Sequence, residues 1–214
     1  MTATTTAPLT VRPAGIVDVT SAARLLESSA PEIDVDGDGF PDGPADPEVA
    51  ASVARMALSH VVLQHGQLWV AERNGVLEAA SVWMPAVETG AGDGLRDVLL
   101  RELHGPSLAA ALDPGAEVRA ALAGASLEVA ALLERIDPEQ ILSGLGVAQH
   151  VSRLAAPAVL RATIMPALEA LDGGVAAAAS LEPERVAVLE SAGFVGVGTV
   201  DVGARHQLWV GRAA

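Results

Sequence analysis

Two strand-like runs flank an Asn-Gly pair in the stretch QLWVAERNGVLEAASVWMP, residues 67–85. Val, Leu and Trp recur in both runs, and Val and Trp in particular favour the pleated, half-buried surface of a sheet. An Asn-Gly pair such as Asn74-Gly75 is typical of a tight hairpin turn, because both residue types tolerate a backbone that other residues avoid. The stretch therefore predicts an antiparallel hairpin, and the other elements are placed around it.

On either side of the hairpin the pattern alternates between strands and helices. Before it, the sequence predicts a strand over residues 9–12 and helices over 18–27 and 47–63. After it, we expect strands over 141–147, 175–180, 193–202 and 206–210, with helices over 153–171 and 183–191. No repeat or linker interrupts this order, so we expect one α/β domain over residues 9–214, with a mixed sheet and helices on both faces.

Three segments lie outside these elements. Residues 1–8 predict a disordered tail without the pattern of a secretory signal. Residues 28–46 form an acidic loop rich in Asp, Gly and Pro. Residues 92–136 are Leu- and Ala-rich, which predicts a helical insertion or lid over one face of the sheet.

The composition argues against several classes of function. The 214 residues carry a formal net charge of -14, and nucleic-acid phosphates repel such a chain, so we expect no nucleic-acid partner. No apolar run approaches the length of a bilayer span, so we expect no membrane partner. The missing secretory signal predicts a cytoplasmic protein. The chain contains no Cys, Lys or Tyr, which removes thiolate and amine nucleophiles and the tyrosine proton donor.

Several stretches resemble the GNAT superfamily of acyl-CoA-dependent N-acyltransferases. Residues 11–14, with Asp18 soon after, look like the family's opening strand and capped helix. Residues 68–83 are similar to the central hairpin of actinobacterial members, and residues 145–194 end in the Gly-Phe pair that precedes the sixth strand. Residues 208–210 resemble the last strand. The resemblance implies an α/β GNAT fold, with a mixed central sheet of about seven strands and helices on both faces.

The same resemblance implies an eroded site for acyl-CoA. The family binds the coenzyme A diphosphate on a Gly-rich loop that opens the helix after strand four, where backbone N–H groups are free. The nearest match here is residues 153–158, which keep the Arg but carry Ala at the glycine positions, and Pro157 has no N–H. The alternative is a plain strand-to-helix connection. The implied cofactor-binding residues are Val147, Arg153, Leu154, Ala155, Ala156 and Ala158.

The acid–base residues that the family would use are also changed. Ser143 aligns with the glutamate that activates the acceptor amine in many relatives, and Leu189 stands in place of a tyrosine that protonates the leaving thiolate. Glu182 could act as an acid or base from the cleft wall, and His150 could carry protons near neutral pH. The alternatives are a hydrogen-bonded strand serine, a carboxylate that favours the helix dipole, and an exposed loop histidine. Our catalytic candidates are thus Ser143, His150 and Glu182.

The acidic loop contains the spacing of a calcium site. Asp34, Asp36 and Asp38 present alternate oxygens before a glycine, and Asp42 is a further candidate ligand. The twelfth position is Ala45 rather than a bidentate Glu, so the ligand set is incomplete. A solvated loop on the substrate side is the alternative to calcium binding.

Three functions stay open on this evidence. The first is transfer of an acyl group from acetyl-CoA or another acyl-CoA to a small molecule of secondary metabolism. The second is cyclisation, elimination or rearrangement of an apolar metabolite on a repurposed fold that does not use acyl-CoA, and the third is non-catalytic binding of a small molecule. Trp83 and Met84 would contact the acceptor in the family geometry, or else pack in the core. We expect a monomer or a homodimer.

Overall fold

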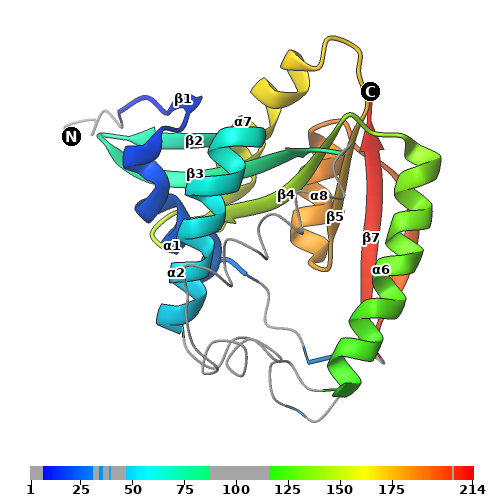
Figure 1. Cartoon of the computed structure of the whole chain (residues 1–214). Helices are drawn as coiled ribbons and strands as arrows, with labels where there is room; N and C mark the ends of the chain where they lie inside the picture. Colours follow the sequence, from blue (N-terminus) through cyan, green and yellow to red (C-terminus); the bar gives the residue numbers. More distant parts are fainter. Residues whose placement is uncertain (1–6, 31–33, 36–38, 40–46, 87–115, 204) are drawn as a thin grey trace.

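The computed structural model describes residues 7–30, 34–35, 39, 47–86, 116–203 and 205–214. Seven strands within them form one sheet in the order β1-β2-β3-β4-β5-β7-β6 (Figure 1). The strands are β1 (Thr10–Pro13), β2 (Gln67–Arg73), β3 (Val76–Pro85), β4 (Gln140–Val147), β5 (Ala176–Ser180), β6 (Val195–Val202) and β7 (His206–Ala213). Only the β4–β5 pair is parallel, so the sheet is mixed, as the sequence predicted.

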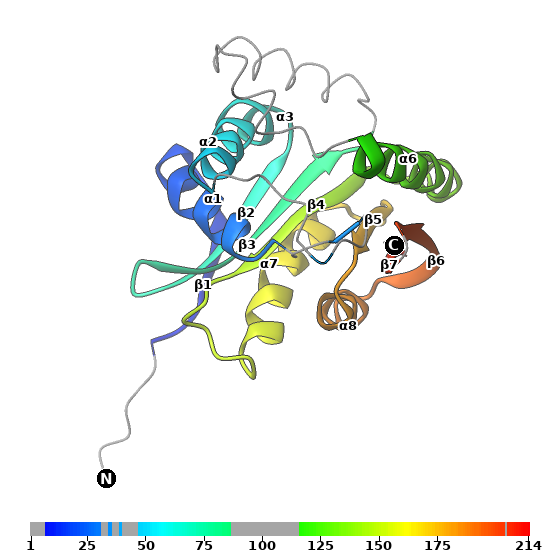
Figure 2. The same cartoon turned by 90° about the horizontal axis from the view of Figure 1, so that it is seen from below.

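Helices cover both faces of this sheet, with α1, α2 and α6 on one face and α7 and α8 on the other (Figure 2). The helical segments are η1 (Ile16–Asp18), α1 (Val19–Ser28), α2 (Pro47–Ala57), η2 (Leu58–Val62), α3 (Leu63–His65), α6 (Ala116–Ile136), α7 (Ala156–Ala170) and α8 (Pro183–Ser191). The single helix expected over residues 47–63 is interrupted, because η2 is a π-helical segment between α2 and α3.

The predicted insertion over residues 92–136 is described only in its last part, which is α6; residues 92–115 lie outside the described residues. Of the expected tail, residues 7–8 alone are described. Within the part of the chain that the structure describes, no helix combines the length and hydropathy that a bilayer span requires.

The hairpin predicted over residues 67–85 is confirmed. Strands β2 and β3 pair from Gln67 opposite Trp83 to Arg73 opposite Val76, with a β-bulge between Ala71 and Glu72. The turn between them places Asn74 at φ 54° and Gly75 at φ 75°. Positive φ at both central positions matches the right-handed twist of the two strands, which explains why Asn-Gly is selected there.

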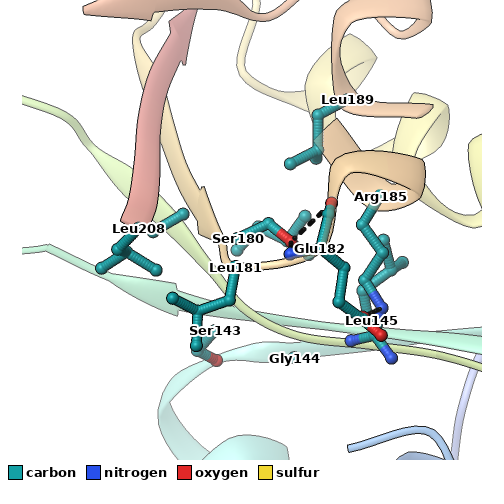
Figure 3. Close-up of a pocket in the computed structure, with 11 residues that line it drawn as sticks. Ser143, Gly144, Leu145, Ser180, Leu181, Glu182, Arg185, Leu189 and Leu208 are labelled. Carbon is teal, nitrogen blue, oxygen red and sulfur yellow. Dashed lines mark hydrogen bonds and ion pairs between the residues drawn. The ribbon is translucent and has the colours of Figure 1, made fainter. Parts of the chain in front are cut away.

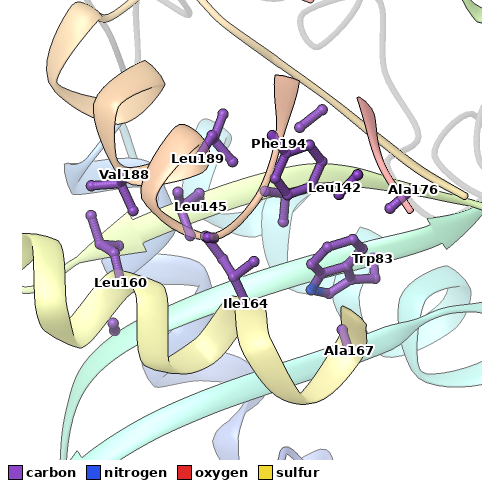
Figure 4. Close-up of a cluster of buried hydrophobic side chains, with 14 of the residues drawn as sticks. Trp83, Leu142, Leu145, Leu160, Ile164, Ala167, Ala176, Val188, Leu189 and Phe194 are labelled. Carbon is purple, nitrogen blue, oxygen red and sulfur yellow. The ribbon is translucent and has the colours of Figure 1, made fainter. Parts of the chain in front are cut away.

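Alternate side chains of β3 divide the core between the two faces of the sheet. Ala79 and Trp83 pack with Ile164 of α7 (Figure 4). Ala80 and Val82 pack in the cluster under α1 and η2. A third cluster joins α6 to β5, β6 and β7. The strand period of two therefore distributes one hydrophobic strand between two helical layers.

An ion cluster ties the first strand to the first helix. Arg12 donates to both carboxylate oxygens of Asp18 at 2.8 and 2.9 Å, and to Glu72 Oε2 at 2.8 Å. The backbone N–H of Gly15 donates to Asp18 Oδ2 at 2.9 Å. The hydrogen bond from Arg12, followed by that from Gly15, lowers the pKa of Asp18 below its ordinary value of 3.8, although burial opposes the shift.

Replacing Asp18 with Asn is expected to lower the free energy of unfolding by about 1–2 kcal/mol at neutral pH, since Arg12 is partly solvated and its contribution is screened. A carboxyl whose folded pKa is depressed stabilises the protein above its unfolded pKa, and this stability is lost as the pH falls through the folded value. Below about pH 4 the wild type should therefore lose stability more steeply than Asp18→Asn. Urea denaturation at neutral and acidic pH measures this.

The matched control is Asp201→Asn, because Asp201 is an exposed aspartate that accepts a hydrogen bond from the neutral side chain of Gln207. This variant should keep the acid sensitivity of the wild type. Equal acid sensitivity in the wild type and Asp18→Asn would contradict the role assigned to the Arg12 contact.

Candidate active site

The candidate site lies where two parallel strands separate. Strands β4 and β5 pair only through Gln140–Leu142 and Ala176–Ala178. Beyond these pairs β4 continues to Val147, where it is still paired with β3. Among the described strands, none pairs with the other edge of β4 from residue 143 onward. No neighbouring strand therefore uses the backbone groups on that edge, which can meet a ligand or another segment of the chain.

Two adjoining cavities occupy this region. The smaller, of about 210 Å³, lies between the middle of β4 and the end of β5 (Figure 3). The larger, of about 390 Å³, lies at the end of β4 and the start of α7. Glu182 and Arg185 line both cavities. The smaller cavity is mainly apolar; its other lining residues are Leu142, Ser143, Gly144, Leu145, Ala179, Ser180, Leu181, Leu189 and Leu208.

Glu182 and Arg185 form a charged pair in this cleft. Glu182 directly precedes α8, and its backbone N–H donates to Ser180 Oγ at 3.2 Å. Its carboxylate makes an ion pair with Nε of Arg185, three residues later. Arg185 Nη2 also donates to the backbone carbonyl of Ser29, which lines the larger cavity. Burial lowers the pKa of Arg185, and the negative charge of Glu182 opposes that shift.

Solved structures of acyltransferases share this arrangement of strands and helices. A protein of the GNAT family from Desulfovibrio desulfuricans superposes with a TM-score of 0.53 at 14% identity, covering 96% of this chain and 98% of that chain. The yncA protein of Salmonella typhimurium, solved with its cofactor acetyl-CoA, gives 0.52 at 13% identity, covering 95% and 92%. The chain has the GNAT fold. The fold expected from the resemblance is therefore confirmed.

A third structure with this fold is the C-terminal condensation domain of Ebony, solved in complex with beta-alanyl-dopamine. It superposes with a TM-score of 0.68 at 8% identity, covering 96% of this chain and 98% of that chain. No protein-family model matches the sequence, and no curated protein matches it. At these identities the likeness establishes the GNAT fold alone, so the chemistry has to be argued from the residues of the cleft.

The loop at residues 153–158, where the resemblance places a diphosphate, makes backbone hydrogen bonds with Ser152. The N–H groups of Ala155 and Ala156 both donate to the carbonyl of Ser152, at 2.9 Å. Pro157 is the second residue of α7 and has no N–H. Among the first three residues of α7, the N–H of Ala156 is bonded to Ser152 and Pro157 has no N–H. Only Ala158 has an N–H that is not bonded to Ser152. The N-terminus of this helix therefore offers an anion few donors.

The other expected cofactor-binding residues lie around this loop. Val147, Arg153 and Ala156 line the larger cavity. The side chain of Leu154 is 94% exposed, so only its backbone could serve a ligand in the cleft. The structure thus brings part of the expected loop to the cavity and turns one side chain away from it.

The three catalytic candidates do not meet in one place. Ser143 and Glu182 line the smaller cavity together, and Ser143 Oγ donates to the carbonyl of Val82 at 3.3 Å (Figure 3). His150 lies in the turn after β4 and lines a separate groove of about 820 Å³ with Arg12 and Asp18. Among the three candidates, Glu182 is therefore the one that lines both cavities of the cleft.

Trp83 lies in the core rather than in the cleft, which corrects the expected contact with the acceptor. Its side chain is 1% exposed, and its Nε1 donates to Ser81 Oγ at 3.1 Å. Met84, on the opposite face of β3, packs at the cluster under α1 and lies beside Gly66. Neither residue lines the two cleft cavities. Side-chain alternation along β3 decides this placement, because residue 83 faces α7.

The proposed calcium ligands fall mostly outside the described residues, which include Asp34 but not Asp36, Asp38 or Asp42. Asp34 Oδ2 lies 3.3 Å from Arg205 Nη1 and accepts a hydrogen bond from the N–H of Gly39 at 3.1 Å. In the part of the chain that is described, no three His, Asp or Glu residues gather as a metal site.

Sequence reasoning missed two residues of the cleft, Arg185 and Ser29. A signal for Arg185 was present, because an arginine in the first turn of a helix is unfavourable with the helix dipole and here follows Glu182 by three residues. Ser29 gave no such signal, since its side-chain partner lies 118 residues away along the chain.

Proposed function

We propose that this protein transfers an acyl group from an acyl-CoA thioester to the amine of a small molecule. The observation that carries the proposal is the separation of β4 from β5 after Leu142 and Ala178, which opens a cleft beside the start of α7. An extended donor can add to a free strand edge through backbone hydrogen bonds. The acceptor amine would enter from the smaller, apolar cavity.

The residues of the cleft suit the amide-bearing arm of an acyl-CoA better than its diphosphate. The free edge of β4 suits an extended arm that contains amides. At the loop before α7, Arg153 can meet a diphosphate, but the N–H groups of Ala155 and Ala156 are already bonded to Ser152. Acyl-CoA would supply the acyl carbon as an activated thioester. Binding would therefore depend mainly on the arm and the acyl group, with a smaller contribution from the diphosphate.

Glu182 is our candidate for the base in this reaction. An amine must lose a proton to attack the thioester carbon, and Glu182 is the carboxylate that lines both cavities. In the transfer, the nitrogen–carbon bond forms, the carbon–sulfur bond breaks, and the departing thiolate takes up a proton from solvent. Leu189, which lines the smaller cavity, cannot supply that proton. Catalysis would rest on positioning the two reactants and on this single base.

A thermal-shift titration with acetyl-CoA tests the donor. A ligand at about 100 times its dissociation constant adds roughly 2.7 kcal/mol to the stability of the folded state, so the melting temperature should rise. Arg153→Ala should weaken the shift and leave the melting temperature without ligand nearly unchanged, because Arg153 is exposed. A melting temperature unaffected by millimolar acetyl-CoA would exclude this donor.

A second candidate is a GNAT-fold protein that holds a small molecule in the same cleft without acyl-CoA, either to rearrange it or only to bind it. Two observations favour it: the hydrogen bonds of the 153–158 loop to Ser152, and the carboxylates of Glu182 and Glu184 that line the larger cavity. Carboxylates would repel a diphosphate at that position. A melting temperature raised by small amides or amine conjugates, such as beta-alanyl-dopamine, but not by acetyl-CoA would favour this candidate.

A further inference from the structure

Ser29 binds both backbone groups of Val147, the last residue of β4. Its hydroxyl donates to the carbonyl oxygen of Val147 at 2.8 Å, and the N–H of Val147 donates to Ser29 Oγ at 3.0 Å. Ser29 follows the last residue of α1, so these two hydrogen bonds join α1 to the end of β4. Both residues line the larger cavity of the cleft.

These backbone groups belong to the free edge of β4. The next residue, Ala148, donates its N–H to the carbonyl of Glu78 at 2.8 Å, which places that group on the β3 side. Successive residues of a strand direct their N–H and C=O groups to opposite edges. The groups of Val147 therefore point away from β3, toward the gap, and Ser29 already satisfies them both.

Two contacts hold Ser29 at this position. Gly146 lets α1 approach β4 closely, since a Cβ there would lie 2.8 Å from Leu25 Cδ2 and 3.1 Å from Leu26 Cα. On the other side of the cavity, Arg185 donates to the carbonyl of Ser29. Ser29 is thus held by elements on both sides of the cleft. Its hydroxyl is bonded to the N–H and the C=O of Val147, the last backbone groups on this edge of β4.

We propose that Ser29 is a specificity-determining residue that competes with the donor for the backbone of Val147. The inference rests on the proposed function, in which an amide-bearing arm adds to the free edge of β4. Such an arm can pair with Val147 only after the Ser29 hydroxyl rotates away and gives up two hydrogen bonds. Ser29 therefore weakens the binding of every ligand that needs this pair of backbone groups.

Hydrogen exchange and binding of pantetheine, measured on the full chain, test the proposal together. In Ser29→Ala the amide of Val147 should exchange at least about tenfold faster than in the wild type, because its partner is gone, while the amide of Ala148 should be unchanged. Pantetheine, which has the amides but no diphosphate, should bind Ser29→Ala about tenfold more tightly by calorimetry. Ser29→Thr keeps a hydroxyl and should restore both wild-type values.

Ser28→Ala is the matched control, because the Ser28 hydroxyl donates to the carbonyl of Leu25 within α1, at 3.0 Å. This variant should exchange and bind like the wild type. Unchanged exchange of Val147 in Ser29→Ala, or equal affinity of both proteins for pantetheine, would overturn the inference and leave the acyl-CoA proposal intact. If neither protein binds pantetheine and acetyl-CoA does not change the melting temperature, both the inference about Ser29 and the acyl-CoA proposal would be overturned.

Discussion

Replacing Trp83 with Ala is expected to lower the free energy of unfolding by about 3–5 kcal/mol, the largest stability loss that we predict for a single substitution. The indole is 1% exposed and packs against α7, including Ile164 (Figure 4). Its Nε1 donates to Ser81 Oγ, which in turn donates to the carbonyl of Thr163 at 2.8 Å. Truncation would leave a cavity and remove one of the two hydrogen-bond partners of the buried Ser81 hydroxyl. Urea denaturation followed by circular dichroism measures the loss.

Trp69 on the neighbouring strand is the matched control. It packs at the edge of the same core but is only partly buried, and its Nε1 donates to Gln67 at 3.0 Å. Trp69→Ala should therefore cost clearly less than Trp83→Ala, because less apolar surface returns to water. A loss below about 1 kcal/mol in Trp83→Ala would show that the indole does not hold the sheet to α7.

Glu182→Gln is expected to reduce kcat/KM by about 10²- to 10⁴-fold if the carboxylate removes the proton of the acceptor amine. Glutamine keeps the size and the position of the side chain but cannot take up a proton. Release of the free thiol from acetyl-CoA, measured with a panel of small amines, provides the assay.

Glu190→Gln is the control for this prediction, because Glu190 lies near the end of α8, is exposed and lines neither cleft cavity. Its kcat/KM should match that of the wild type. The melting temperature of Glu182→Gln separates catalysis from structure, since a folded but inactive variant points to the chemistry. A Glu182→Gln enzyme with an unchanged kcat/KM would assign the base to another group.

The elements predicted from the sequence agree with the structure where the signal is local. Alternating apolar residues and the Asn74-Gly75 turn gave the β2–β3 hairpin, and β4 begins at residue 140 where the sequence predicted 141. The π-helical segment η2 was not predicted, because helical periodicity alone does not distinguish a π segment from a regular turn.

The candidate site was predicted only in part. Ser143 and Glu182, two of the catalytic candidates, line one cavity, and their catalytic roles stay predictions. His150 does not line that cavity, because the direction of a loop after a strand is set by packing that the sequence does not display. Trp83 was predicted to contact the acceptor but lies in the core. The alternation of side chains along a strand shows which residues share a face, but not which face contacts the ligand.

The sequence by itself determined the hairpin, the order of strands and helices and the absence of cysteine, lysine and tyrosine chemistry, because these depend on residue type and on periods of two and 3.6 residues. Only the tertiary structure decided that Ser29 closes on Val147 across 118 residues and that Arg185 reaches Ser29 across 156. Such contacts arise when packed helices bring distant parts of the backbone together. Here Gly146, which has no side chain, lets α1 approach β4 closely. No local pattern encodes that distance.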